Sequence, residues 1–368
     1  MWKNYLKIAF RSLIKRRLFT VVNLLGLVLG LVAFLGLFAY VATEWSYNDF
    51  HANKDRIYRI VVNDGDESFE TFLPPGYAGV LETNFSDISS AARVANDIAG
   101  GLIAIPETDL VFREDAINFV EGDFFQTFSF PIARGTADLT ATNTAVITQG
   151  MADKFYGNSD PIGESFFLSN QFGKQEFIVT GVLEAIPFRS DIKGNVFLSI
   201  STLENPDNRS GNDWADPNGF DSGFVNLFIL AKEGVDQNKL AEQLTSFIRQ
   251  TPNSEETTII LQDLPSIHLG NSISDPLPTT SEMGAVLVFL AIAILILAIA
   301  YVNYLNLSSA NILTRIKEIK MRKVLGAHAW QLAQQFMTET LLILLVSLFI
   351  SIIGLNLLAP FATSIFGK

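Results

Sequence analysis

Three long stretches of this sequence contain no Asp, Glu, Lys or Arg side chain, and they limit what the chain can fold into. They are Leu18–Thr43, Gly284–Leu313 and Thr340–Gly367. Each supplies the roughly 20 apolar residues that a helix needs to cross ~30 Å of hydrocarbon. Buried helices of a soluble core are the alternative, but a core helix of that length normally keeps a polar face. The sequence therefore predicts three membrane-spanning helices, at residues 18–43, 283–308 and 339–361, with a tail at 362–368.

The charged residues are spread unevenly, and their positions predict which side of the membrane each segment occupies. Residues 1–17 carry six basic and no acidic side chains, and residues 310–330 carry five basic ones with a single Glu318. Residues 44–282 carry 36 acidic and 14 basic side chains. Because basic loops stay in the cytoplasm, both basic segments are expected inside and the acidic region outside. These short basic segments beside the spans do not suggest nucleic-acid binding.

The first 17 residues combine basic and apolar side chains at helical spacing. Lys3, Lys7, Arg11 and Lys15 recur every four residues, and apolar residues take the other side. An apolar face opposite a basic face is typical of helices at the lipid interface. We predict a cytoplasmic amphipathic helix over residues 1–17; charge that only sets the topology is the alternative.

The first span is expected to remain as an anchor. Its apolar run exceeds the about 7–15 residues of a signal-peptide core, and no small-residue cleavage site closes it cleanly. A cleaved signal peptide is the alternative. Gly26 and Gly30 form a GxxxG pattern, which lets two helices approach closely. These glycines are candidates for helix packing or a dimer contact.

Residues 44–282 read as an α+β domain inserted between the first two spans of an integral membrane α-helical protein. A strand, a helix capped by Asp236 and another strand follow one another near its end, which suggests a ferredoxin-like unit. The segment Asn205–Ser222 is rich in Asn, Asp, Gly and Pro and predicts a loop. The predicted strands are Ile57–Val62, Thr144–Thr148, Phe177–Leu183, Phe224–Leu230 and Thr258–Leu261, and the predicted helices are Met151–Tyr156 and Asn238–Arg249.

The cytoplasmic segment at residues 309–338 contains a helical pattern over Thr314–Leu325. Helical spacing places Arg315, Glu318 and Arg322 along one side. A short helix parallel to the membrane between two spans would serve as a docking element. A basic loop that only obeys the orientation rule is the alternative.

Motifs for catalysis or cofactor binding are absent from the sequence. No GxxxxGK[ST] loop is present for ATP, and His51, His268 and His328 lie far apart, without a Cys/His cluster for a metal. We therefore expect no catalytic residue, no metal site and no cofactor bound by this chain. A loose divalent-cation site in the acidic loop Asp207–Asp221 is the alternative, and a membrane-anchored enzyme is the least favoured function.

Several motifs resemble those of one transporter family. The stretch from Asn303 to Ala327 resembles the signature of the FtsX-like permease domain, and Glu44-x-Ser46-Tyr47-x-x-Phe50-His51 resembles a motif after the first span of long permeases in that group. In the outer region, Val120–Pro131, Ala152–Gly163 and Val179–Val182 resemble a MacB-like periplasmic core domain. The signature positions, which would couple to an ATPase, are Arg315, Glu318, Ile319, Arg322, Lys323, Gly326 and Ala327.

The resemblance implies a permease subunit of an ABC transporter in the inner membrane of a bacterium. Such a subunit would dock on a separate cytoplasmic ABC ATPase that binds the ATP, and would pair with a second permease copy or half and with membrane lipid. A periplasmic adaptor is a further implied partner. Motion of the outer domain, called mechanotransmission, would drive efflux. Family units carry a further span, so the chain is expected to be the first portion of a longer permease. The alternative function is a non-transporting regulator of a periplasmic cell-wall hydrolase.

Overall fold

In the computed structural model the chain forms two compact units. One consists of Met1–Thr43 with Gly284–Lys368, and the other of Glu44–Met283. The structure describes residues 10–366 apart from 12, 16, 64–68, 107–109, 251–255, 271–276, 278–280 and 325–327. Most of the amphipathic helix predicted at residues 1–17 lies outside the described residues. We call the two units the membrane unit and the periplasmic unit.

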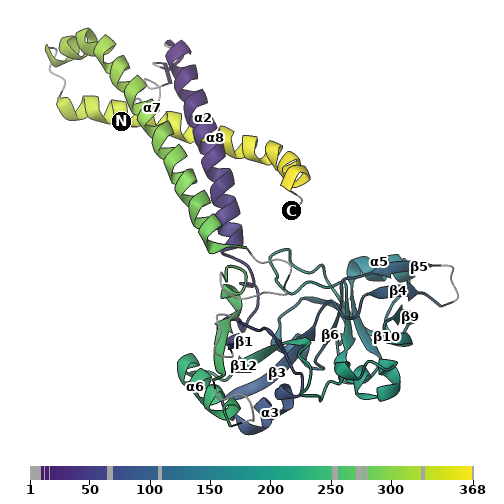
Figure 1. The fold of residues 1–368 in the computed structure, drawn as a ribbon. Coiled ribbons are helices and arrows are strands. Elements are labelled where there is room, and N and C mark those ends of the chain that lie inside the picture. The colour runs from purple at the N-terminus through teal and green to yellow at the C-terminus, as the bar shows by residue number, and fades with distance from the viewer. Residues whose placement is uncertain are drawn as a thin grey trace. The chain divides into compact units, whose positions relative to one another are not determined.

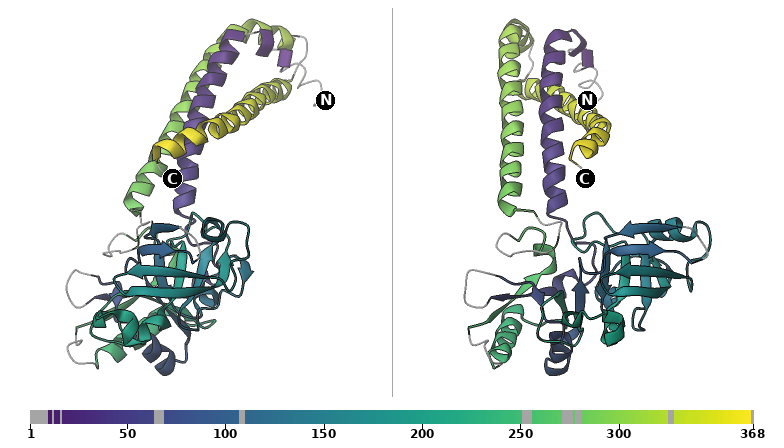
Figure 2. Two further views of the ribbon diagram at one scale, coloured as in Figure 1. Left: turned by 90° about the vertical axis from the view of Figure 1, so that its right-hand side faces the viewer. Right: turned by 45° about the vertical axis from the view of Figure 1, so that its right-hand side comes forward.

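The membrane unit contains three long apolar helices: α2 (Arg17–Glu44), α7 (Met283–Val324) and α8 (Ala329–Phe366). The segments long and apolar enough to cross a bilayer are Arg17–Glu44, Met283–Ala310 and Trp330–Leu358. Helices α2 and α7 run side by side, and α8 crosses them (Figures 1 and 2). The prediction of three spans flanking an α+β domain is therefore confirmed.

Helix α7 differs from the expectation in one respect. A separate short helix was expected over Thr314–Leu325, but α7 is one uninterrupted helix of 42 residues from Met283 to Val324. The prediction that this segment forms a helix of its own was wrong, whereas its helical conformation is confirmed up to Val324. The physical reason is local, because the sequence from Tyr301 to Val324 contains no Gly or Pro that would break or kink a helix.

One half of the periplasmic unit is ferredoxin-like. Its four strands follow the order β13-β1-β12-β3, with every neighbouring pair antiparallel. Helices α3 and α6 cover one face (Figure 1), where Leu81 and Leu244 join the buried cluster that contains Leu227. The ferredoxin-like prediction is confirmed. The elements are β1 (Ile57–Asn63), α3 (Tyr77–Asn84), β3 (Ile88–Ala95), β12 (Val225–Ala231), α6 (Gln237–Ile248) and β13 (Thr258–Asp263).

The predicted cap of α6 is present. The Asp236 carboxylate accepts hydrogen bonds from the backbone N–H groups of Asn238 at 3.0 Å and Lys239 at 3.3 Å. These bonds satisfy amide groups that have no partner within the helix. The prediction that Asp236 starts this helix is therefore confirmed.

The other half of the periplasmic unit is inserted between β3 and β12. It extends the sheet in the order β6-β11-β8-β10-β9-β4-β5, while β2 pairs with β12 and β7 with β10. The predicted strands and the short helix after β8 are all present, with bounds that shift at their ends. Strand β2 (Phe72–Leu73) precedes β3 in the chain. The elements of the insert are β4 (Gly101–Ala104), β5 (Val111–Glu114), β6 (Ile117–Val120), α4 (Phe124–Thr127), β7 (Ile132–Gly135), β8 (Thr144–Thr148), α5 (Gln149–Tyr156), β9 (Ser165–Asn170), β10 (Gly173–Leu183) and β11 (Val196–Ser199).

An aromatic core joins the two halves into one unit. Phe124, Phe128 and Phe197 from the insert are fully buried in one cluster with Phe228 and Ile57 from the ferredoxin-like half. The rings of Phe128 and Phe228 meet edge to face at 5.2 Å, a favoured aromatic geometry. The shared core explains why the sheet continues across both halves.

The predicted loop over Asn205–Ser222 contains only short 3₁₀ turns. They are η3 (Pro206–Arg209) and η4 (Asp213–Ala215). In this loop the Asp216 carboxylate pairs with the Arg209 guanidinium at 3.0 Å. The remaining 3₁₀ turns of the unit are η1 (Lys54–Arg56), η2 (Ile200–Glu204) and η5 (Leu264–Ser266).

Candidate functional site

The predicted coupling residues lie at the C-terminal end of helix α7. Helical spacing places Arg315, Glu318 and Arg322 along one side of that helix. Ile319 and Lys323 belong to the same helical turns. The last two predicted positions, Gly326 and Ala327, lie outside the described residues. The sequence-predicted set thus falls on a helix that continues directly from a membrane span.

Exposed apolar side chains are present near the end of α7 and the start of α8. Met321 is 63% exposed, Val324 87% and Trp330 66%. Met321 and Val324 follow the segment Met283–Ala310 that can span the membrane. Large apolar side chains grouped on a surface commonly mark a binding site for another protein or a membrane. Near the end of α7, the sequence thus combines basic residues with exposed apolar side chains.

The two glycines of the GxxxG pattern face α7 within the membrane unit. A Cβ atom added at Gly26 would lie 3.1 Å from the side-chain amide of Asn303. A Cβ atom added at Gly30 would clash with the Ala300 side chain. In lipid, the hydrophobic effect does not drive helices together, so they associate through close packing, which small residues allow. The structure thus places both glycines in packing between helices of one chain.

Polar side chains also connect the three membrane helices. The Ser351 hydroxyl of α8 donates to the backbone oxygen of Val28 in α2 at 3.2 Å. The Tyr304 hydroxyl of α7 donates to the Thr340 hydroxyl of α8 at 2.9 Å. Hydrogen bonds between helices in lipid are each worth about 0.6–2 kcal/mol. Sequence reasoning missed these contacts because single Ser, Thr and Tyr residues in apolar runs do not reveal their partners.

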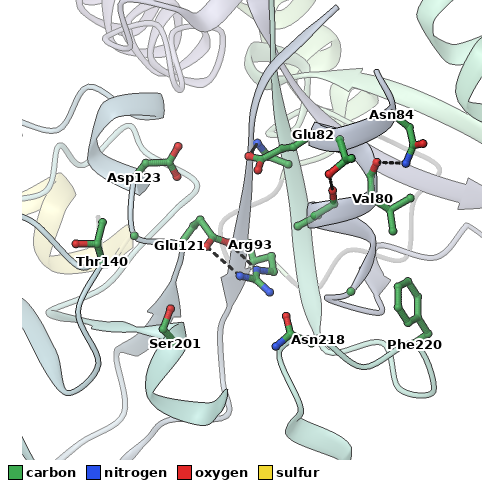
Figure 3. A pocket seen from close by; sticks show the side chains of 16 residues that line it. Val80, Glu82, Asn84, Arg93, Glu121, Asp123, Thr140, Ser201, Asn218 and Phe220 are labelled. Atoms are coloured by element: carbon green, nitrogen blue, oxygen red, sulfur yellow. Dashed lines mark hydrogen bonds and ion pairs between the residues drawn. The ribbon is translucent and has the colours of Figure 1, made fainter. Parts of the chain in front are cut away.

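A cleft of about 680 Å³ opens in the periplasmic unit. Figure 3 shows side chains from α3, from β3, from the turn after β6 and from the loop at Asn218 and Phe220 around it. The Arg93 guanidinium forms a two-point ion pair with the Glu121 carboxylate, with Nη2 2.9 Å from Oε1. Arg93 also donates to the backbone oxygen of Pro217, so it ties together three segments at the cleft.

The cleft has a negative electrostatic character. Burial and, secondarily, the carboxylates of Glu121 and Glu82 raise the pKa of Asp123 from 3.8 to about 6. One guanidinium, that of Arg93, faces three carboxylates in this space. The arrangement can accept hydrogen bonds from a polar or cationic group. Sequence reasoning missed the cleft because its residues come from separate elements.

The acidic loop was the alternative position for a metal. Within the described ranges, no three or more His, Cys, Asp or Glu side chains are arranged to hold a metal ion. In that loop, hydrogen bonding by the Asn218 backbone and by Arg209 lowers the pKa of Asp216. The two remaining candidate regions are the end of α7 and the cleft of the periplasmic unit.

Fold and site together define a class of protein: a membrane protein with three spans and a periplasmic-type α+β domain between the first two. The family model of the MacB-like periplasmic core domain matches residues 20–247, and that of the FtsX-like permease C-terminal domain matches residues 290–368. Because the first match covers more than half of the chain, the protein belongs to the family with a MacB-like periplasmic core domain.

Curated relatives carry names from the same family. The macrolide export ATP-binding/permease protein MacB of Marinobacter nauticus is 23% identical, over 93% of this chain and 51% of that protein. MacB of Bradyrhizobium diazoefficiens is 22% identical, over 93% of this chain and 50% of that protein. The chain thus spans about half the length of these relatives. The crystal structure of the periplasmic region of MacB from Actinobacillus actinomycetemcomitans aligns with a TM-score of 0.40 and 16% identity, over 55% of this chain and 88% of that one.

Proposed function

We propose that this protein is the permease subunit of a bacterial ABC transporter in the cytoplasmic membrane, and that it converts ATP hydrolysis by a separate ATPase into motion of its periplasmic unit. ATP is bound by the partner ATPase and not by this chain. The presence of both family domains in one chain, and the export names of the relatives, support this proposal. The periplasmic unit would act on the exported substrate on the outer side of the membrane.

The observation that carries the proposal is the continuity of helix α7. At 1.5 Å per residue, a 42-residue helix is about 63 Å long, roughly twice the thickness of the hydrocarbon layer. Its first residue, Met283, is also the last residue of the periplasmic unit. Its other end carries Arg315, Glu318, Ile319, Arg322 and Lys323. One continuous helix therefore connects the proposed docking residues to the chain that enters the periplasmic unit.

Charge and apolar exposure support docking of the ATPase at this end. Arg322 is expected to contact acidic groups on the ATPase, while Val324 and Trp330 enter an apolar groove on it. Gly326 and Ala327 are proposed to end the docking element. A second permease copy or half would complete the membrane assembly, and lipid and a periplasmic adaptor are the further proposed partners.

Capture of the ATPase tests this function. The tagged protein is purified in mild detergent, and the co-purifying ATPase subunit is identified by mass spectrometry. Arg322→Glu should reduce the captured ATPase several-fold. Lys320→Glu is the matched control, because it makes the same change of charge on the other side of the same helix and should capture nearly as much as the parent. Equal capture by the parent and Arg322→Glu would remove the docking assignment, and no ATPase with the parent would remove the function.

A further inference from the structure

A buried cluster of one histidine and two carboxylates joins three distant segments of the periplasmic unit. The Nε2 atom of His268 lies 2.9 Å from a Glu44 oxygen, and its Nδ1 atom lies 2.8 Å from an Asp191 oxygen. The three side chains are only 0–1% exposed. Each ring nitrogen thus has a carboxylate oxygen at hydrogen-bond distance, so the imidazole bridges the two carboxylates.

Two neighbours of Glu44 complete this cluster. The Tyr47 ring stacks on His268, with centroids 3.4 Å apart and planes 7° from parallel. The Asn48 amide donates to the second Asp191 oxygen at 2.6 Å and to the backbone oxygen of Leu264 at 3.0 Å. The side-chain oxygen of Asn48 accepts the backbone N–H of Asp191 at 3.0 Å. Each of the three segments is thus held by more than one bond.

The cluster occupies a particular place in the chain. Glu44 is the last residue of α2. His268 lies after β13 and η5, on the stretch of chain that leads to the start of α7 at Met283. Asp191 lies in the connection between β10 and β11, within the inserted half of the unit. The cluster therefore joins the segment entering from α2, the segment leaving towards α7, and the insert.

Stability alone does not account for such a cluster. Replacing a buried charge cluster by apolar residues of similar volume is often neutral or stabilising, and the aromatic core already joins the two halves. Charge-assisted hydrogen bonds are short and directional, so they fix one geometry more strictly than apolar packing does. A contact that transmits a displacement from one segment to another needs such a fixed geometry.

We infer that Glu44, His268 and Asp191 form a mechanical joint, through which displacement of α2 and α7 enters the periplasmic unit. This inference rests on the proposed function, and it assigns these three side chains as positioning residues for the coupling. It also explains the motif from Glu44 to His51. Its Glu and Tyr belong to the joint, while Phe50 and His51 pack into the aromatic core with Phe130.

The test measures ATP-driven displacement separately from ATP hydrolysis. The sequence contains no cysteine, so Gln243→Cys on α6 and Leu357→Cys on α8 provide two unique sites for spin labels. Both positions are exposed. The labelled protein, diluted with unlabelled copies, is assembled with its ATPase in lipid nanodiscs. The distance between the labels is measured with and without ATP, and turnover is measured on the same samples.

Glu44→Ala removes one carboxylate from the joint, and the ATP-driven shift in label distance should fall below half of that in the parent while turnover stays within twofold. Glu44→Gln keeps an acceptor oxygen in nearly the same place and should recover most of the shift. His51→Gln is the matched control, because His51 is also a buried histidine but lies outside the joint. Its shift should equal that of the parent.

The outcomes separate the two proposals. If ATP changes the label distance in the parent and changes it equally in Glu44→Ala, the joint is overturned and the proposed function is left intact. A parent that hydrolyses ATP without any shift overturns the proposed function and the joint with it. Where thermal unfolding shows that Glu44→Ala does not fold, His268→Gln takes its place, and an undiminished shift in that variant overturns the joint.

Discussion

The stability of the periplasmic unit should depend on pH through His51. This side chain is 2% exposed and meets the rings of Phe128 and Phe130 edge to face, with centroids 5.4 and 5.1 Å away. Burial lowers the pKa of His51 from 6.5 to about 4. The backbone N–H of Ser129 donates to Nδ1 at 3.1 Å, so a proton at that nitrogen would also displace a hydrogen bond.

The sign and size of the effect follow from the two pKa values. The unfolded chain takes up the proton near pH 6.5 and the folded chain only near pH 4, so the free energy of unfolding decreases as the pH falls through this window. Relative to pH 8, the expected loss is about 2 kcal/mol at pH 5 and about 3 kcal/mol at pH 4.

Urea unfolding of a fragment of residues 44–282, followed by tryptophan fluorescence, measures this loss. The His51→Gln variant has no titrating group at this position, so it should not show this loss. As the pH falls from 8 to 4, the free energy of unfolding of the variant minus that of the parent should therefore increase by the amounts given above. Other groups titrate in both proteins and cancel in the difference. Parallel pH curves for parent and variant would refute the argument that His51 is buried in its neutral form.

Four further substitutions test the packing and the cap of α6. Gly30→Val should destabilise the membrane unit by about 1–3 kcal/mol through the clash with Ala300, and Ala300→Gly should restore part of the loss, as measured by thermal unfolding in detergent. Leu244→Ala removes a fully buried side chain of α6 and should cost about 2–5 kcal/mol in urea unfolding of the fragment. Asp236→Ala removes the cap of α6 and should cost about 1 kcal/mol in the same assay; no change would show that another group satisfies those amides.

Local patterns predicted much of the secondary structure, because they depend on neighbouring residues. The apolar runs, the β-branched strands and the Asp236 cap needed no distant contact to be recognised. The boundary between span and coupling segment was the exception. A basic sequence after an apolar one indicates the end of a span but not the end of a helix, and α7 continues through that change to Val324.

The two candidate regions differ in how far the sequence could reveal them. The proposed coupling positions from Arg315 to Lys323 form a local pattern, and Gly26 and Gly30 form another. The buried cluster could not be predicted, because Glu44 and His268 are 224 residues apart and Asp191 belongs to an insert. The sequence showed three scattered histidines without a shared role.

The sequence by itself determined that this chain carries three helices long and apolar enough to cross a membrane, and it located most of the strands and helices of the periplasmic unit. These properties follow from hydrophobicity, charge and local spacing, which act over a few residues. Only the tertiary structure decided that His268 meets two carboxylates, that Gly30 packs against Ala300, and that Arg93 closes one side of an acidic cleft. Contacts between distant residues depend on sheet order and helix packing, and these are set by the cooperative burial of the whole core rather than by any one segment.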